Sequence, residues 1–276
     1  MKNHDLEDIE LALLLEAIYQ RYGHDFRHYA KASIKRRVRK IMGLAAVQNI
    51  SQLIPRLMHD EAFFSEALGE FSVPVSEMFR DPAFFKAMRT SVIPYLKTYP
   101  YVKIWIAGCA SGEEVFSTAV ILEEEGFYDR ATIFATDFNS EVLKRASEGL
   151  YPLDKMRDFT ANYQAAGGRR SFSDYYHANY DSAILDKSLT RNITFAGHNL
   201  VTDGVFSEMH LILCRNVMIY FDKILQDRVL KLFLDSLIPG GVLALGSKET
   251  LHFAAVMDKF QVMDQTWKIY RKNILG

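Results

Sequence analysis

Several features are scarce in this chain of 276 residues, and each scarcity excludes a class of protein. Its two cysteines, Cys109 and Cys214, are too few for a disulfide framework, and nothing near them has the spacing of zinc ligands. No apolar run approaches the ~20 residues that a membrane-spanning helix needs. The apolar patch at 11–15 follows a cluster of acids, which is the wrong flank for a signal peptide. We therefore expect a soluble, cytoplasmic protein of a reducing compartment, without a bound metal or direct membrane insertion.

The chain also lacks an excess of charge of either sign, because 33 Lys and Arg stand against 34 Asp and Glu. A net charge of -1 gives no global attraction to nucleic acid, so no nucleic-acid partner is expected. Positive charge is concentrated locally instead. Between Arg21 and Gly43 there are eight basic residues and one acid, which is a net charge of 8 − 1 = +7.

Residues 1–72 predict a helical domain. The apolar residues of the first segment recur at helical spacing: Leu6, Ile9, Leu13 and Ile18. A second helix is expected from about 28 to 42, with Gly43 as its C-cap. A third amphipathic pattern covers 63–71.

Residues 73–276 predict an α/β domain. Short apolar runs at 102–107, 132–136, 193–196, 211–214 and 242–246 alternate with amphipathic stretches at 113–125, 140–148 and 223–237. This alternation favours a parallel sheet covered by helices. The last runs, 260–263 and 267–270, are typical of a terminal antiparallel hairpin. The polar, tyrosine-rich stretch at about 152–192 fits neither pattern and is interpreted as an inserted subdomain.

The loop after the first apolar run has the character of a ligand site. It reads Gly108-Cys-Ala-Ser-Gly112 and leads into a helix that begins with Glu113 and Glu114. Glycines allow close approach of a ligand to the backbone, and two acids suit a cationic ligand better than a pyrophosphate. The spacing is neither that of a dinucleotide fingerprint nor that of a P-loop. The alternative is a tight strand-to-helix turn without a ligand.

Polar residues follow the other predicted strands at the same edge of the sheet. Asp137 suits a ribose diol, although it or Asn139 would serve equally well as a helix N-cap. Arg215 and Asn216 follow the fourth run, where an Arg needs a partner because it directly follows a buried strand. For His198, which follows the third run, we favour a structural role. A linker with Ser76 and Arg80 joins the helical domain to the sheet and either closes over the site or is simply solvated.

Five segments, in this order, resemble the chemotaxis receptor methyltransferases, the CheR-type enzymes. They are Phe-Arg-Asp-Pro (79–82), Ala-Gly-Cys-Ala-Ser-Gly-Glu-Glu (107–114), Ala-Thr-Asp (135–137), Cys-Arg-Asn-Val-Met-Ile-Tyr-Phe (214–221) and Pro-Gly-Gly-Val-Leu (239–243). The resemblance implies a Rossmann-like S-adenosylmethionine-dependent methyltransferase domain with an N-terminal helical domain and a small inserted subdomain. It also implies methylation of glutamate side chains on chemoreceptors, with S-adenosylhomocysteine as the product.

The resemblance implies roles for individual residues. Cofactor-binding residues would be Ser76, Arg80, Gly108, Glu113, Asp137, Asn199, Leu200, Arg215 and Asn216. Tyr220 would lie near the transferred methyl, and Arg80 would act there as well. The sequence departs from the family pattern at Pro74, where Asn is usual, at Ser76, where Thr is common, and at Gly246-Ser-Lys-Glu249, where Gly-His-Ser-Glu is common.

The basic second helix is a candidate for docking an acidic helical region of a receptor, which is the substrate type that the resemblance implies. The residues concerned are Lys35, Arg36, Arg37, Arg39 and Lys40. The alternative is a solvated face that balances the acidic N-terminus. Three other functions stay open: a methyltransferase for a different acceptor, a non-catalytic receptor-binding adaptor with a weakened cofactor site, and, least favoured by the glycine spacing, a dehydrogenase.

Overall fold

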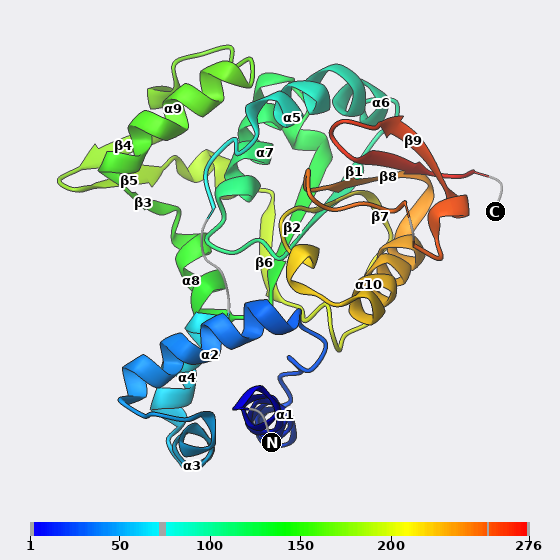
Figure 1. Cartoon of the computed structure of the whole chain (residues 1–276). Coiled ribbons are helices and arrows are strands. Elements are labelled where there is room, and N and C mark those ends of the chain that lie inside the picture. The colour runs from blue at the N-terminus through cyan, green and yellow to red at the C-terminus, as the bar shows by residue number, and fades with distance from the viewer. Residues whose placement is uncertain (1–2, 72–75, 253, 275–276) are drawn as a thin grey trace. The chain divides into compact units, whose positions relative to one another are not determined.

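The computed structural model of the chain describes residues 3–71, 76–252 and 254–274 (Figure 1). The chain forms two compact units, and each is described here by itself. One contains the residues up to Val73 together with Met218–Val229, and the other contains Pro74–Val217 and Leu230–Gly276. The predicted boundaries, 1–72 and 73–276, did not include this return of 218–229 to the N-terminal unit. No helix among the described residues is long and apolar enough to cross a membrane.

The N-terminal unit is built from helices, namely α1 (Asn3–Tyr22), α2 (Lys31–Ala45), η1 (Ile50–Gln52), α3 (Leu53–His59) and α4 (Glu61–Phe71). The helical spacing at the start of the chain corresponds to α1, although Leu6, Ile9 and Leu13 are 49%, 49% and 57% exposed. The buried row consists of Leu11, Leu14, Leu15 and Ile18. Gly43 does not end α2, since the helix continues to Ala45 and the left-handed Ala46 is the C-cap.

The larger unit contains the predicted sheet. In the described part of the chain its order is β6-β2-β1-β7-β8-β10-β9, in which β6, β2, β1, β7 and β8 run parallel to one another and β10 is antiparallel to β8. The strands are β1 (Val102–Ala107), β2 (Ala131–Asp137), β6 (Ile193–Gly197), β7 (Met209–Cys214), β8 (Leu237–Leu245), β9 (Phe260–Asp264) and β10 (Ile269–Lys272). The last two form the predicted antiparallel hairpin. The chain runs outward from β1 to β2 and β6, and then returns beside β1 as β7. Such a reversal makes the carboxyl ends of β1 and β7 the expected ligand crevice.

Helices cover both faces of this sheet, as Figure 1 shows for α7 and α10. Helices α7 (Glu113–Glu124) and α8 (Ser140–Glu148) follow β1 and β2, and α10 (Lys223–Ser236) precedes β8. Ile104 and Ile106 share a buried core with Val115 and Phe116 of α7. Trp105 points to the other face, because side chains alternate along a strand, and its ring contacts Phe233 of α10.

Two further helical regions complete the unit. Before β1, α5 (Pro82–Ala87), the π-helical turn η2 (Met88–Val92) and α6 (Ile93–Leu96) follow one another without a break. The predicted insertion contains α9 (Met156–Ala165) and a small antiparallel sheet of β3 (Leu150–Pro152), β5 (Ser182–Leu185) and β4 (Tyr176–Asn179). Single 3-10 turns lie at η3 (Tyr128–Arg130), η4 (Leu153–Lys155), η5 (Phe172–Tyr175), η6 (Lys187–Thr190), η7 (Met218–Tyr220) and η8 (Met257–Lys259).

Candidate active site

The loops after β1 and β7 pass close to one another at the carboxyl ends of these strands. Gly108 has a φ of +72°, and a Cβ built on it would lie 2.7 Å from the side chain of Val217. A larger residue would therefore be strained in its backbone and would push the two loops apart. The N–H groups of Gly108 and Cys109 both donate to the carbonyl of Thr136 on β2, at 2.8 and 2.9 Å. The predicted glycine loop is thus hydrogen-bonded to β2 and lies against the loop that follows β7.

Asp137 ends β2 and holds the same loop. Its carboxylate accepts the N–H of Ala110 and the N–H of Asn139, each at 3.1 Å. The N-cap of α8 is Asn139, whose side-chain oxygen accepts the N–H groups of Glu141 and Val142. The capping role that was open to Asp137 is therefore filled by its neighbour. Burial raises the pKa of Asp137, while the hydrogen bonds from backbone amides oppose that effect.

Glu113 is the second buried carboxylate of the crevice and stands in the first turn of α7. The hydroxyl of Ser111 donates to it at 2.7–2.8 Å, and Ser76 also hydrogen-bonds to it. Burial raises its pKa, and the two serine hydroxyls oppose that effect. Two buried carboxylates, one at the end of β2 and one in the first turn of α7, thus flank the loop of small residues between β1 and α7.

Arg215 has the protein partners that its position after a buried strand requires. Its guanidinium donates to Glu114 at 2.8 Å, to Asp81 at 2.7 Å and to the carbonyl of Arg80 at 3.3 Å, and it stacks on the ring of Phe84. The side chain is 1% exposed. These contacts indicate an indirect contribution to a ligand site, through the placement of residues 80 and 81.

Glu249 is a residue of this site that the sequence reasoning missed. Its carboxylate accepts the N–H groups of Asn216 (3.1 Å), Val217 (3.0 Å) and Gly246 (2.6 Å), and so fixes the loop after β7 to the loop after β8. Asn216 adopts a left-handed conformation with φ of 61°. The only sequence signal for Glu249 is the departure from the family pattern at 246–249.

An open cavity of 330 Å³ lies in the larger unit and is connected to Arg215 and Glu113 through two of its lining residues, Asp81 and Ser76. Its lining comes from the start of the linker and from the insertion: Ser76, Glu77, Arg80, Asp81, Pro82 and Asn162. Both predicted linker residues, Ser76 and Arg80, therefore belong to the same wall. Pro74 lies outside the described residues.

Asn199 and Leu200 follow β6, as predicted. The side-chain oxygen of Asn199 accepts the N–H of Val201, and its own N–H donates to Asp203, so these residues form a tight turn. Leu200 is 7% exposed. His198 is buried, lies within hydrogen-bond distance of the carbonyl of Gly204 and packs on Trp105, which agrees with the structural role expected for it. The place of Asn199 and Leu200 on the adenine side of the cofactor stays a prediction.

Family models match nearly the whole chain. The CheR methyltransferase SAM-binding domain matches residues 74–269, and the CheR methyltransferase all-alpha domain matches residues 9–72. The chain belongs to the CheR methyltransferase family. This confirms the predicted fold class and the predicted cofactor, S-adenosylmethionine.

Named relatives of the family cover most of the chain. A Pseudomonas putida protein named "Putative methyltransferase Cher3" is 50% identical over 266 residues, which is 96% of this chain and 97% of the relative. A "Chemotaxis protein methyltransferase" of Listeria monocytogenes is 29% identical and covers 83% of this chain and 85% of its own. One of the same name from Salmonella typhimurium is 24% identical, with 95% and 90% covered.

The residues of the crevice fit the cofactor of the CheR family by their chemistry. S-adenosylmethionine carries an ammonium group, a positively charged sulfur and a ribose diol. The buried carboxylates of Glu113 and Asp137 are acceptors for such groups, and the N-terminus of α7 offers backbone donors for a carboxylate. Which atom of the cofactor each residue contacts stays a prediction.

Tyr220, the predicted residue near the transferred methyl, belongs to the N-terminal unit. Its carbonyl accepts the N–H of Ala30 at 2.7 Å, and the guanidinium of Arg37 lies 4.6 Å from the centre of its ring. Arg37 also donates to the carbonyl of Phe71 and is 4% exposed. Arg37 is therefore unavailable to a docking partner, which corrects its place among the predicted docking residues.

Of the other predicted docking residues, Arg36, Arg39 and Lys40 are exposed and Lys35 is half-buried. Glu7 and Asp8 of α1 form ion pairs with Lys31, Lys35 and Arg39 of α2. Lys40 pairs with Glu70 of α4 at 3.2 Å. The local charge of +7 is thus largely balanced by acids of the N-terminal unit. This agrees with the alternative that the basic face balances the acidic N-terminus. Docking of a partner on this face stays a prediction.

Proposed function

We propose that this chain transfers the methyl group of S-adenosylmethionine to glutamate side chains of chemoreceptors. The observation that carries the proposal is the cavity of the larger unit, which is lined by the cationic Arg80, by Ser76 and by two carboxylates, Glu77 and Asp81, of which Asp81 is paired with Arg215. The guanidinium of Arg80 suits a carboxylate acceptor, while the hydroxyl of Ser76 already donates to Glu113. Relatives named "Chemotaxis protein methyltransferase" support the same acceptor class.

Bound S-adenosylmethionine supplies a methyl group on a positively charged sulfur. In the proposed reaction a glutamate oxygen forms the new O–CH₃ bond of an ester, the S–CH₃ bond breaks, and its electron pair stays on sulfur. Glutamate is already ionised near neutral pH, so the chain needs no general base. Its contribution is alignment and exclusion of water, because opposite charges are neutralised as the transition state forms.

Arg80 would hold the acceptor carboxylate or that of the cofactor, and Tyr220 would orient the methyl group or the acceptor oxygen. Ser76 and Glu113, joined by a hydrogen bond, connect the wall of the cavity to the first turn of α7. We expect Tyr220→Phe to lower turnover more than cofactor affinity. An equal loss of both would argue against an orienting role for its hydroxyl.

The experiment is transfer of labelled methyl from S-adenosylmethionine to purified cytoplasmic fragments of chemoreceptors. Label that is released as methanol by alkali identifies a carboxyl methyl ester, because N-methyl groups survive this treatment. Calorimetric titration with S-adenosylhomocysteine, with Asp137→Ala alongside, reports the cofactor site separately. Cofactor binding without transfer to any fragment would reject glutamate methylation and favour a different acceptor or an adaptor.

We propose the exposed basic residues of α2 as the docking surface for an acidic receptor helix. Arg36, Arg39 and Lys40 are exposed, and Lys35 is half-buried between two acids. Arg36→Glu with Lys40→Glu should weaken binding of the receptor fragment strongly at low salt and little at high salt. Unchanged binding at low salt would mean that this face is only solvated.

A further inference from the structure

The segment 76–81, called here the Arg80 segment, has an unfavourable backbone on both sides of Arg80. Phe79 has a φ of 54° and Asp81 a φ of 57°, although both carry a Cβ that disfavours the left-handed region. Such residues persist where surrounding contacts determine them, and they cluster at functional sites. The direction of the Arg80 side chain therefore depends on what holds its two neighbours.

The inserted subdomain supplies much of that hold. The side-chain amide of Asn162, on α9, donates to the carbonyl of Met78 at 3.1 Å and lies 3.4 Å from the carboxylate of Glu77. The ring of Phe79 is fully buried and meets the rings of Tyr163 and Phe172 edge-on, with centroids 5.3 and 6.0 Å apart. From the other side, Ser117 of α7 accepts the N–H of Phe79 at 2.8 Å.

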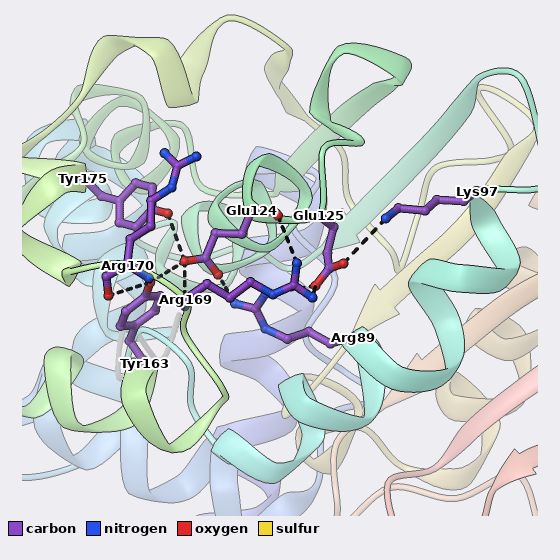
Figure 2. A network of polar contacts seen from close by, with 8 residues as sticks. All are labelled: Arg89, Lys97, Glu124, Glu125, Tyr163, Arg169, Arg170 and Tyr175. Carbon is purple, nitrogen blue, oxygen red and sulfur yellow. Dashed lines mark hydrogen bonds and ion pairs between the residues drawn. The ribbon is translucent and has the colours of Figure 1, made fainter.

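The insertion is in turn fixed to the end of α7 by a polar network (Figure 2). Glu124 has a side chain with 0% exposure, and it accepts the phenol hydroxyls of Tyr163 and Tyr175 and the N–H of Arg169. Arg89 also pairs with Glu124, and Glu125 pairs with Arg89 and Arg169. Burial raises the pKa of Glu124, but the hydrogen bonds outweigh it and keep its pKa below the usual value.

A close approach within the insertion places Tyr163 in this network. A Cβ built on Gly168 would fall 2.2 Å from the Tyr163 ring, so no other residue fits there without moving that ring. Tyr163 and Asn162 are adjacent on α9. The network that fixes the phenol therefore also fixes the amide against the Arg80 segment.

We propose that Asn162 is a positioning residue that fixes the direction of Arg80, so that the insertion forms part of the active site. Asn162 and Arg80 line the same cavity, and Asn162 contacts the backbone two residues before Arg80. The inference rests on the role given to Arg80 in the proposed function. Its structural half, the hold of Asn162 on the Arg80 segment, can be tested independently of any acceptor.

Hydrogen exchange measured by mass spectrometry tests that structural half on the full chain. Asn162→Ala should speed exchange of two backbone amides by tenfold or more: that of Phe79, which donates to the Ser117 hydroxyl, and that of Arg80, which donates to the backbone carbonyl of Glu77. Gln164→Ala removes an exposed amide from the same helix and is the matched control, with exchange unchanged. Unchanged exchange in Asn162→Ala would overturn the inference whether or not the chain methylates glutamate.

Kinetics test the functional half with a receptor fragment that accepts methyl from the unaltered chain. We expect Asn162→Ala to lower kcat at least tenfold, and Asn162→Asp to lower it further, because a carboxylate would face the Met78 carbonyl and Glu77. In an Arg80→Ala background, Asn162→Ala should cause no further loss, since both act as one unit. Additive losses would overturn the positioning role and leave only a contribution to stability. Faster exchange without transfer by the unaltered chain would reject the proposed function but retain the hold on the segment.

Discussion

At the scale of single residues, Glu249 connects the ends of two strands through one buried carboxylate. Its oxygens accept three backbone N–H groups, from Asn216, Val217 and Gly246. A Cβ at Gly246 would lie 2.8 Å from both the backbone nitrogen of Asn216 and the Glu249 carboxylate, so no larger residue fits between them. The proposed cofactor residue Asn216 therefore owes its strained position to a side chain from another loop.

Glu249→Gln should disrupt this arrangement, because the new NH₂ group would face N–H donors. A buried donor left without a partner costs about 1–3 kcal/mol, and we expect the free energy of unfolding to fall by that amount. Binding of S-adenosylhomocysteine should weaken about tenfold, or about 1.4 kcal/mol. Urea denaturation and calorimetry would measure the two effects, with the exposed Lys248→Gln as control. Unaltered stability would show that the loop does not depend on this carboxylate.

Glu113 carries a pH dependence whose sign follows from its burial. Its pKa in the folded chain is raised above the ordinary 4.5. Its contribution to stability is therefore present below pH 4.5 and is lost as the pH rises through the raised value. Glu113→Gln should remove this pH dependence, so the stability of the unliganded variant relative to the parent should rise between pH 4.5 and pH 7. Urea denaturation of the parent and the variant across this range checks the prediction.

At the scale of elements, local pattern predicted the sheet well and the faces of the helices less well. The apolar run 102–107 coincides with β1, and the stretch 140–148 coincides with α8. In α1 apolar residues lie on more than one side, so periodicity allowed two faces and tertiary packing selected Leu11, Leu14 and Ile18. Helix α9 was missed although Met156, Phe159 and Tyr163 have helical spacing, because its polar surroundings resembled a loop.

Acids of α1 already occupy cations of α2 that an acidic partner would use. Hydrogen bonds from Lys31 and Lys35 lower the pKa of Asp8 to about 2, so Asp8 stays ionised and paired at all physiological pH values. Its stabilising contribution is present above the ordinary 3.8 and is lost only as the pH falls towards 2. An acidic partner helix would have to displace Glu7 and Asp8 from the cations that it uses.

Glu7→Gln combined with Asp8→Asn should therefore strengthen binding of an acidic receptor fragment several-fold at low salt and steepen its salt dependence. Calorimetric titration at two salt concentrations provides the measurement. Glu10→Gln is the matched control, because Glu10 accepts a hydroxyl of Ser51 and its loss frees no cation. Equal affinities in all three chains would indicate that the partner binds elsewhere.

At the scale of the whole molecule, residues 218–229 belong to the N-terminal unit although they follow β7 in the chain. The N–H of Asp222 donates to the carbonyl of His28 at 2.8 Å, and its carboxylate lies 2.9 Å from the His28 ring. Tyr29 and Phe221 form an isolated antiparallel bridge. No sequence pattern predicts these pairs, because about 190 residues separate the partners. The sequence contains the motif around Tyr220, but it does not predict that this motif belongs to the N-terminal unit.

This connection predicts that 218–226 opens together with the N-terminal helices. Leu53→Ala, at a fully buried position of α3, should cost about 2–5 kcal/mol. Hydrogen exchange should then quicken in α1 to α4 and in 218–226, with little change in β1 and β7, because local stability follows the cooperative unit. Leu96→Ala, equally buried in the larger unit, should show the opposite pattern. If 218–226 instead exchanged with β7, the Tyr220 loop would be held by the sheet, and the contacts to His28 and Tyr29 would not stabilise it.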